Sequence, residues 1–566
     1  MDKVQFRVLY REFLFRMVDL EVLSPQALGD SSKLFGQFAA MLISISLALT
    51  IMGFGAAGPR WMTVDQRQMV IWSNEHFLIS FTMLIVGLFA VLSWDSTFPT
   101  KLDVMVLAPL PVRPKTLFLA KVTGIAVALA LVVATLHCLA QATWPYSVAA
   151  QAPLVFDGHA IPLATGFLNY WRTFAAFWIT LFAAGAFIFC AVLALQGLIA
   201  LFLTRSWYLR VSSWLQLGLF CFFICGIMTM PMKASPTSLA AAQGNGLAGW
   251  QFTFWFLGLF QELKGSPALP VLAHRAWLGL AGVIGTAAVA FVFSYFRMLR
   301  KIVEEPDILP STRGAIWLPS FGDSLQTALG HFSVRTLLRS RQHRMIFAFY
   351  LGIGFGLTTV VFALPIHMQG GAIRMQLISG TIFTLLLSLV GARIVFAIPA
   401  DLRANWIFRI TPIRGGLNCL RARRRAILAI AVLPVWLAVA ALLLWWWPVS
   451  LAASHLAILG LLGAILGEIC LLGFQKIPFT CSYLPGKTNI HVTLLFSVMV
   501  LLQFIGYCAY LENGILDSPW KLAGLLAALA VIWYVLRRRT NEQAESDDLG
   551  LMFEDPGTPA VQGLGL

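Results

Sequence analysis

Long runs of apolar residues, separated by short polar segments, make up most of this chain. A helix needs about 20 apolar residues to cross the hydrocarbon core of a bilayer. Twelve runs reach roughly that length, at residues 34–57, 76–95, 117–141, 172–203, 209–231, 272–297, 345–366, 375–397, 426–447, 451–474, 491–511 and 518–536. The pattern therefore predicts an all-α polytopic membrane protein with about 12 transmembrane helices.

Other segments are apolar on one helical face only. In residues 5–23, Phe6, Leu9 and Phe13 share one face, and Leu325 and Leu329 begin a similar stripe before the seventh run. Such helices are typical of the plane between lipid headgroups and acyl chains, so we expect amphipathic interfacial helices at both places. The aromatic segment 250–263 predicts a further interfacial helix on the outer face.

The order of elements is repeated along the chain. A surface helix, two spans, a short segment with Pro and Arg, and four more spans occur twice, as tandem repeats do in many transporters. We therefore expect a first six-helix half at 1–297, a cytoplasmic linker with its amphipathic helix at 298–344, and a second six-helix half at 345–537. The acidic tail, 538–566, has the composition of a disordered segment.

The charges indicate an orientation in the membrane. Only 11% of the residues are charged and 59% are hydrophobic, and the net charge is +15. Lys and Arg concentrate in alternate loops and at both ends, which is the positive-inside pattern and excludes nucleic acid as a partner. We expect a multi-pass protein of the cell's inner membrane, surrounded by the lipid bilayer, with both termini in the cytoplasm.

Motifs for chemistry are missing from the sequence. Pro485 to Thr488 imitates the end of a phosphate-binding loop, but Cys481 stands at the required earlier glycine position and no strand precedes it. No zinc-protease, hydrolase or paired-carboxylate motif is present either. We expect no catalytic, cofactor-binding or metal-binding residues, no bound cofactor and no enzyme activity in this chain.

Two ionisable residues fall inside predicted spans. Arg393 lies near the cytoplasmic end of the eighth run and Glu468 lies in the tenth. A charge at the bilayer centre costs about 2.5–3.5 kcal/mol on insertion scales. One hypothesis is that the two residues pair; the alternative is that Arg393 extends to the nearby interface.

The segment between the second and third runs resembles a known family. It reads Asp103, five residues, Pro-Leu-Pro-Val-Arg-Pro, six residues and Lys121. This is similar to the cytoplasmic element of ABC-2-type permeases, the membrane subunits of ATP-binding-cassette exporters. The resemblance implies six spans after an amphipathic helix and a coupling helix that begins at an acidic residue. It also implies contact with the ATPase through the residues Asp103, Pro109, Pro111, Arg113, Lys115 and Lys121.

A looser copy precedes the ninth run. Thr411-Pro-Ile-Arg414 aligns with Leu110-Pro-Val-Arg113, which adds the candidate coupling residues Asp401, Arg409, Pro412 and Arg414. The copy departs from the family pattern, because Ala404 takes the acidic position and Ala422 the Lys position.

The resemblance implies an ABC exporter permease that moves its substrate by alternating access, driven by an ABC-type ATPase on a separate chain. The main alternative is a twelve-span secondary transporter of the major-facilitator kind. Against it, the second loop lacks that family's Gly-x₃-Asp pattern, and no buried acidic proton site is evident. A membrane enzyme or assembly factor is the third class, and the scarcity of clustered polar residues argues against the enzyme.

Overall fold

The computed structural model is almost entirely helical in the residues that it describes. These are 3–18, 31–54, 63–99, 104–105, 107, 109–145, 154–156, 159–161, 167–233, 247–265, 269–304, 323–363, 370–400, 406–410, 416–472, 474, 477–480 and 490–546. The chain divides into two compact units, Met1–Pro310 and Ser311–Leu566, and the boundary falls inside the predicted linker. That these units are two related halves stays a prediction.

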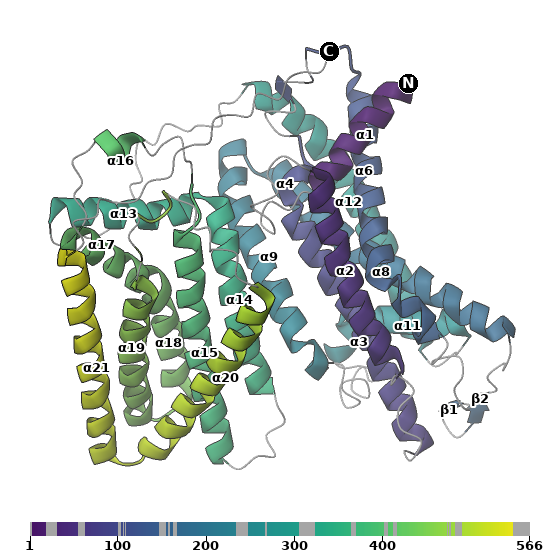
Figure 1. Ribbon diagram of the computed structural model, residues 1–566. Coiled ribbons are helices and arrows are strands. Elements are labelled where there is room, and N and C mark those ends of the chain that lie inside the picture. The colour runs from purple at the N-terminus through teal and green to yellow at the C-terminus, as the bar shows by residue number, and fades with distance from the viewer. Residues whose placement is uncertain are drawn as a thin grey trace. The chain divides into compact units, whose positions relative to one another are not determined.

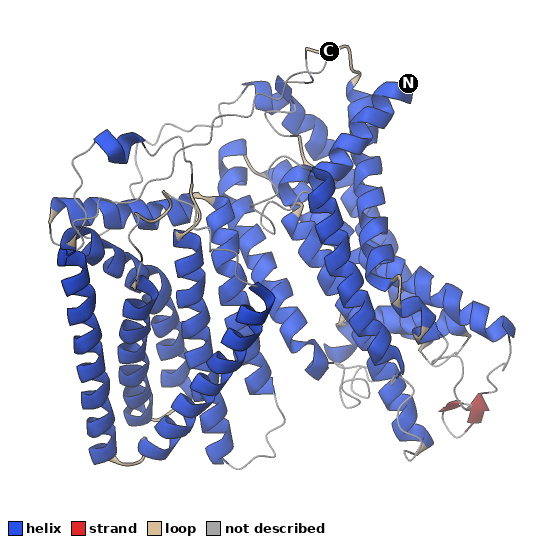
Figure 2. Ribbon diagram, in the orientation of Figure 1, coloured by secondary structure: helices blue, strands red, loops and turns tan. Residues whose placement is uncertain are grey.

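The first unit is built from helices (Figure 1). They are α1 (Lys3–Val18), α2 (Ser31–Phe54), α3 (Val64–Leu92), α4 (Trp94–Thr97), α6 (Pro114–His137), α8 (Phe167–Phe202), α9 (Arg205–Lys233), α11 (Phe252–Lys264) and α12 (Pro270–Glu304), with 3-10 turns at Ala140–Ala142 and Leu247–Trp250. The long helices α2, α3, α6, α8, α9 and α12 follow predicted apolar runs. One element was not expected from the sequence. β1 (Leu154–Phe156) and β2 (His159–Ile161) pair as a short antiparallel hairpin, the red arrows of Figure 2.

The second unit also contains both short and long helices. Its elements are α13 (Ser324–Arg339), α14 (Arg341–Ala363), α15 (Gly370–Phe396), α16 (Trp406–Ile410), α17 (Leu417–Ile427), a π-helical turn (Leu428–Val432), α18 (Leu433–Trp446), α19 (Val449–Leu471), α20 (Ile490–Ile515) and α21 (Pro519–Ser546). In Figure 1, α13 runs across the ends of the upright helices α14, α15 and α21.

Helices of membrane-spanning length are the main feature of both units. Among the described residues, 8 helices are long and apolar enough to cross a bilayer. They occupy Gln68–Leu92, Pro114–His137, Phe167–Phe202, Pro270–Met298, Arg374–Phe396, Leu417–Trp446, Val449–Leu471 and Pro519–Glu545. The membrane character expected from the sequence is confirmed at this level, whereas the count of twelve spans stays a prediction.

A proline inside the longest span of the second unit explains its π-helical turn. Pro434 has no N–H to donate to the preceding turn, so an unbroken α-helix would leave a carbonyl without its partner there. The chain widens into the π-turn at Leu428–Val432 just before the proline. Ser388 on α15 donates a hydrogen bond of 2.8 Å to the Ala431 carbonyl, so the widened turn also fixes α15 against this helix.

The aromatic helix α11, for which the sequence predicted an interfacial position, is packed inside the first unit; its position relative to a membrane interface stays a prediction. Most of its residues from Thr253 to Lys264 are buried, and it packs between α3, α8 and α12. Gly258 allows this close packing, because a Cβ there would lie 2.7 Å from the Ala273 backbone nitrogen. The apolar character of the segment therefore serves burial inside the first unit.

Candidate functional site

The first candidate site is the Pro/Arg segment, residues 100–115. Val104, Met105 and Leu107 are helical, and the chain then turns at Pro109 to Pro111 before α6 begins. Pro114 occupies the first helical position, where its missing N–H costs nothing, and Arg113 is the N-cap residue. Pro109, Pro111, Arg113 and Lys115 are all exposed, as a surface for a partner requires. Asp103 lies outside the described residues.

Lys121 differs from the other predicted coupling residues because it is buried. Its ammonium donates a hydrogen bond of 2.7 Å to the Phe98 carbonyl, just beyond α4, and lies 5.1 Å from the centre of the Phe13 ring. A buried charge needs such partners. Lys121 therefore joins α1, α6 and the chain just before the Pro/Arg segment, and its role in coupling stays a prediction.

The amphipathic helix α1 packs against this segment. Phe13 on α1 forms a small apolar cluster with Leu117 and Ala120 of α6, and Leu107 of the Pro/Arg segment packs on it from the side. The apolar face that predicted a membrane-surface helix thus contacts protein. The segment is held between α1 and α6.

The second unit contains a similar arrangement at its own Pro/Arg segment, residues 400–416. Leu329 of the surface helix α13 clusters with Cys419 and Ala422 of α17, and Phe408 of α16 packs on them. In the sequence alignment of the two segments Phe408 stands opposite Leu107, so both aligned positions contact their own surface helix. Asp401, Pro412 and Arg414 lie outside the described residues, as does the side chain of Arg409.

The chain leading into the second segment is also fixed by side-chain and backbone bonds. His343 at the start of α14 lies 3.0 Å from the Ile398 carbonyl, and the Ala400 N–H donates to the Phe479 carbonyl at 2.9 Å. Ala422 carries no charge, but its neighbour Arg423 is buried and donates to the Phe474 carbonyl. Each unit therefore buries a cation near the start of the helix that follows its Pro/Arg segment.

The hypothesis that Arg393 pairs with Glu468 is wrong, because Glu468 pairs with a different arginine. Arg424 of α17 forms the ion pair, with Nη2 donating to Oε2 at 2.8 Å, and Thr540 of α21 donates to the same oxygen at 3.1 Å. The Arg393 guanidinium lies over the Phe474 ring, 4.1 Å from its centre. Arg424 was missed because the sequence placed it in a loop, whereas α17 carries it into the bundle.

The sequence showed no buried acidic residue that could bind a proton, but the structure contains buried acids at Glu75 and Glu512. Glu75 on α3 forms an ion pair of 3.6 Å with Lys264 on α11, and both side chains are only 3% exposed. Glu512 on α20 lies 2.5 Å from His455 Nδ1 on α19, with side-chain exposures of 2% and 1%. Sequence reasoning missed both acids because each falls one residue outside a predicted span and was counted as a loop residue.

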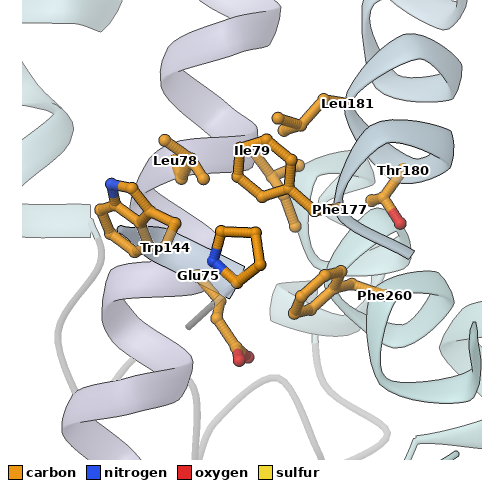
Figure 3. A pocket seen from close by; sticks show the side chains of 9 residues that line it. Glu75, Leu78, Ile79, Trp144, Phe177, Thr180, Leu181 and Phe260 are labelled. Atoms are coloured by element: carbon orange, nitrogen blue, oxygen red, sulfur yellow. The ribbon is translucent and has the colours of Figure 1, made fainter. Parts of the chain in front are cut away.

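Glu75 also borders an apolar pocket in the first unit (Figure 3). The rings of Trp144, Phe177 and Phe260 surround it, with Leu78 and Ile79 behind them and Glu75 at its edge. Thr180 also lines the pocket, and its buried hydroxyl has no hydrogen-bond partner among the residues that the structure describes. The polar side chains Glu75 and Thr180 come from α3 and α8, and both of these helices pack against α11.

Comparison with known proteins gave no identification: no family model, no curated protein and no solved structure matches this chain. The fold defines a helical protein whose long apolar helices suit a membrane. Any more specific function has to be argued from the two Pro/Arg segments and the buried charges.

Proposed function

We propose that this chain is the permease subunit of an ABC exporter, driven by an ATPase on a separate chain. One observation carries the proposal: in each unit an amphipathic surface helix packs on both the Pro/Arg segment and the start of the next long helix. A segment held in this way can pass a push from a partner into the helix that follows. A freely moving loop could not.

The mechanism is mechanical and requires no chemistry from this chain. ATP-driven movement of the partner presses on residues 100–115 and 400–416, and the displacement enters α6 and α17. Because α1 contacts both the first segment and α6, segment and helix move together. The buried Lys121 keeps the segment attached at Phe98 during each cycle.

The test uses exposed residues whose substitution leaves the core intact. Arg113→Glu combined with Lys115→Glu reverses the charge of the first segment, and both side chains are exposed. We expect substrate-stimulated ATP hydrolysis by the purified complex to be lost while the abundance of the chain in the membrane stays the same. Lys521→Glu, at an exposed position at the start of α21, is the matched control. Full stimulation in the double variant would refute the proposal.

A second candidate is a proton-coupled secondary transporter, and the buried pair of His455 and Glu512 favours it. Intramembrane acids and histidines commonly mark proton pathways in transporters. The two candidates predict different requirements. Reconstituted alone in liposomes, a secondary transporter moves substrate in response to a proton gradient, whereas an ABC permease requires the ATPase and ATP.

A further inference from the structure

The pair formed by His455 and Glu512 belongs to a chain of three hydrogen-bonded side chains. Thr381 Oγ1 on α15 lies 3.0 Å from His455 Nε2, and His455 Nδ1 lies 2.5 Å from Glu512 Oε1. All three residues are almost completely buried. The order hydroxyl, imidazole, carboxylate suits proton transfer, because the carboxylate fixes which ring nitrogen carries the first proton.

The Thr381 hydroxyl has two possible acceptors for its single hydrogen. Besides His455 Nε2, it lies 2.9 Å from the Ile378 carbonyl one turn earlier on α15. When His455 is neutral, Nδ1–H donates to Glu512 and Nε2 accepts the hydroxyl hydrogen. When Nε2 is protonated it donates to Thr381 Oγ1, and the hydroxyl turns to the Ile378 carbonyl. Both states satisfy the ring nitrogens and the hydroxyl.

We propose that Thr381, His455 and Glu512 form a proton-binding site that takes up one proton from solution at His455 Nε2. The loaded site is an imidazolium paired with the Glu512 carboxylate, and the unloaded site is a neutral imidazole beside the same carboxylate. Since the three residues come from α15, α19 and α20, the proton changes the attraction between three long helices. This site goes beyond the proposed coupling to an ATPase and does not depend on it.

A similar pair in the first unit provides an internal comparison. Thr82 Oγ1 on α3 lies 2.9 Å from His137 Nε2 on α6, and it also donates to the Leu78 carbonyl at 2.7 Å. His137 Nδ1 is buried and has no hydrogen-bond partner among the described residues. A protonated His137 would therefore bury both an unpaired donor and an uncompensated charge. The two sites differ in the Glu512 carboxylate, which lies beside His455 and has no counterpart at His137 among the described residues. We therefore expect His455, and not His137, to take up a proton and become an imidazolium.

Among the residues that the structure describes, Glu512 is the charged side chain paired with His455. On α20, Cys508 lies one turn before Glu512, and on α15 Arg374 is already held by Asp517 and Asn513. The α18 residues Leu433–Trp446 contain no ionisable side chain, and the following Trp447 places its ring 6.1 Å from the imidazole. On α21, which packs against α19, Lys521 near the first turn is exposed. Glu512 is thus the counter-charge for His455.

Solid-state NMR of the full chain in lipid, labelled with ¹⁵N-histidine, tests the site, because imidazolium and neutral nitrogens have different chemical shifts. His455→Asn and His137→Asn assign the two signals. We expect His455 to give the imidazolium signal in acid and the neutral signal in alkali, while His137 stays neutral in both. A His455 signal that never becomes imidazolium would overturn the proposal, as would an imidazolium at His137.

Three substitutions separate the proton site from a set of merely structural hydrogen bonds. Glu512→Gln keeps the shape and an acceptor but removes the counter-charge, so the imidazolium-to-neutral ratio of His455 should fall at least about tenfold at a given pH. Thr381→Val removes the alternating hydroxyl and should also shift the titration, and Thr381→Ser should restore it. Variants are compared after size-exclusion chromatography confirms a single species. An unchanged His455 titration in Glu512→Gln would contradict the assignment.

Discussion

Removing Glu468 should destabilise the second unit by breaking a buried ion pair that joins three helices. The side chains of Arg424 and Glu468 are 9% and 1% exposed, and Arg424 Nη2 also donates to Thr540 Oγ1 at 3.1 Å. Glu468→Gln keeps the shape but leaves the guanidinium without its counter-charge. Loss of one partner of a buried pair costs about 3–5 kcal/mol. In a domain of this size we expect the unfolding temperature to fall by about 10 °C.

The assay is thermal unfolding of the detergent-purified chain, followed by intrinsic fluorescence. In the double variant Arg424→Met, Glu468→Leu the charges disappear together, so it should be more stable than Glu468→Gln. A double-mutant cycle should give a coupling energy of about 2 kcal/mol between Glu468 and Arg424, and a much smaller one between Glu468 and Arg393. Arg538→Gln is the control, because the Arg538 side chain in its surface pair is 69% exposed.

An unfolding temperature unchanged by Glu468→Gln would refute this reasoning, since a buried guanidinium cannot lose its counter-charge without cost. Strictly additive effects at Glu468 and Arg424 would refute it as well, because they would mean that the two charges do not interact. A strong coupling to Arg393 would instead restore the pairing that the sequence suggested.

Three further predictions concern other parts of the chain. Lys121→Met should lower stability by about 1.5–3 kcal/mol, measured as a fall in unfolding temperature, by leaving a buried carbonyl without its donor. Gly258→Ala should lower the unfolding temperature, whereas Gly282→Ala should not, because only the first added Cβ meets backbone atoms. The hydrogen bond from Arg374 holds the pKa of Asp517 below its usual value. The bond therefore contributes its full stability at a pH above the usual Asp pKa, and this stability is lost as the pH falls through the lowered pKa of Asp517. Arg374→Gln should raise the Asp517 pKa in an NMR titration.

The long apolar helices of the fold could be predicted from hydrophobic pattern alone, because a run of about 20 apolar residues has few stable alternatives to a helix in lipid. The same pattern located α1 and α13, whose apolar faces are plain in the sequence. It did not show that α11 is packed inside the first unit, because most of its positions are apolar enough to face either lipid or protein. Neighbouring helices decided between these two environments.

The exposed part of the candidate coupling site was also readable from sequence, since Pro109, Pro111 and Arg113 follow one another along the chain. The partners of the buried charged residues could not be read from the sequence. Glu512 meets His455 and Glu468 meets Arg424 across helices that are distant in sequence, and residue spacing does not determine which side chain faces which. Only helix packing fixes those partners.

The sequence by itself determined that this protein is a set of long apolar helices, with amphipathic helices and Pro/Arg segments between them, because backbone hydrogen bonding and hydrophobic length are local properties. The tertiary structure decided which charges are buried and with what partner. An ionisable group inside a bundle is tolerated only where another helix brings a counter-charge or a hydrogen bond within about 3 Å. That condition depends on packing, and so only the fold brings Thr381, His455 and Glu512 together.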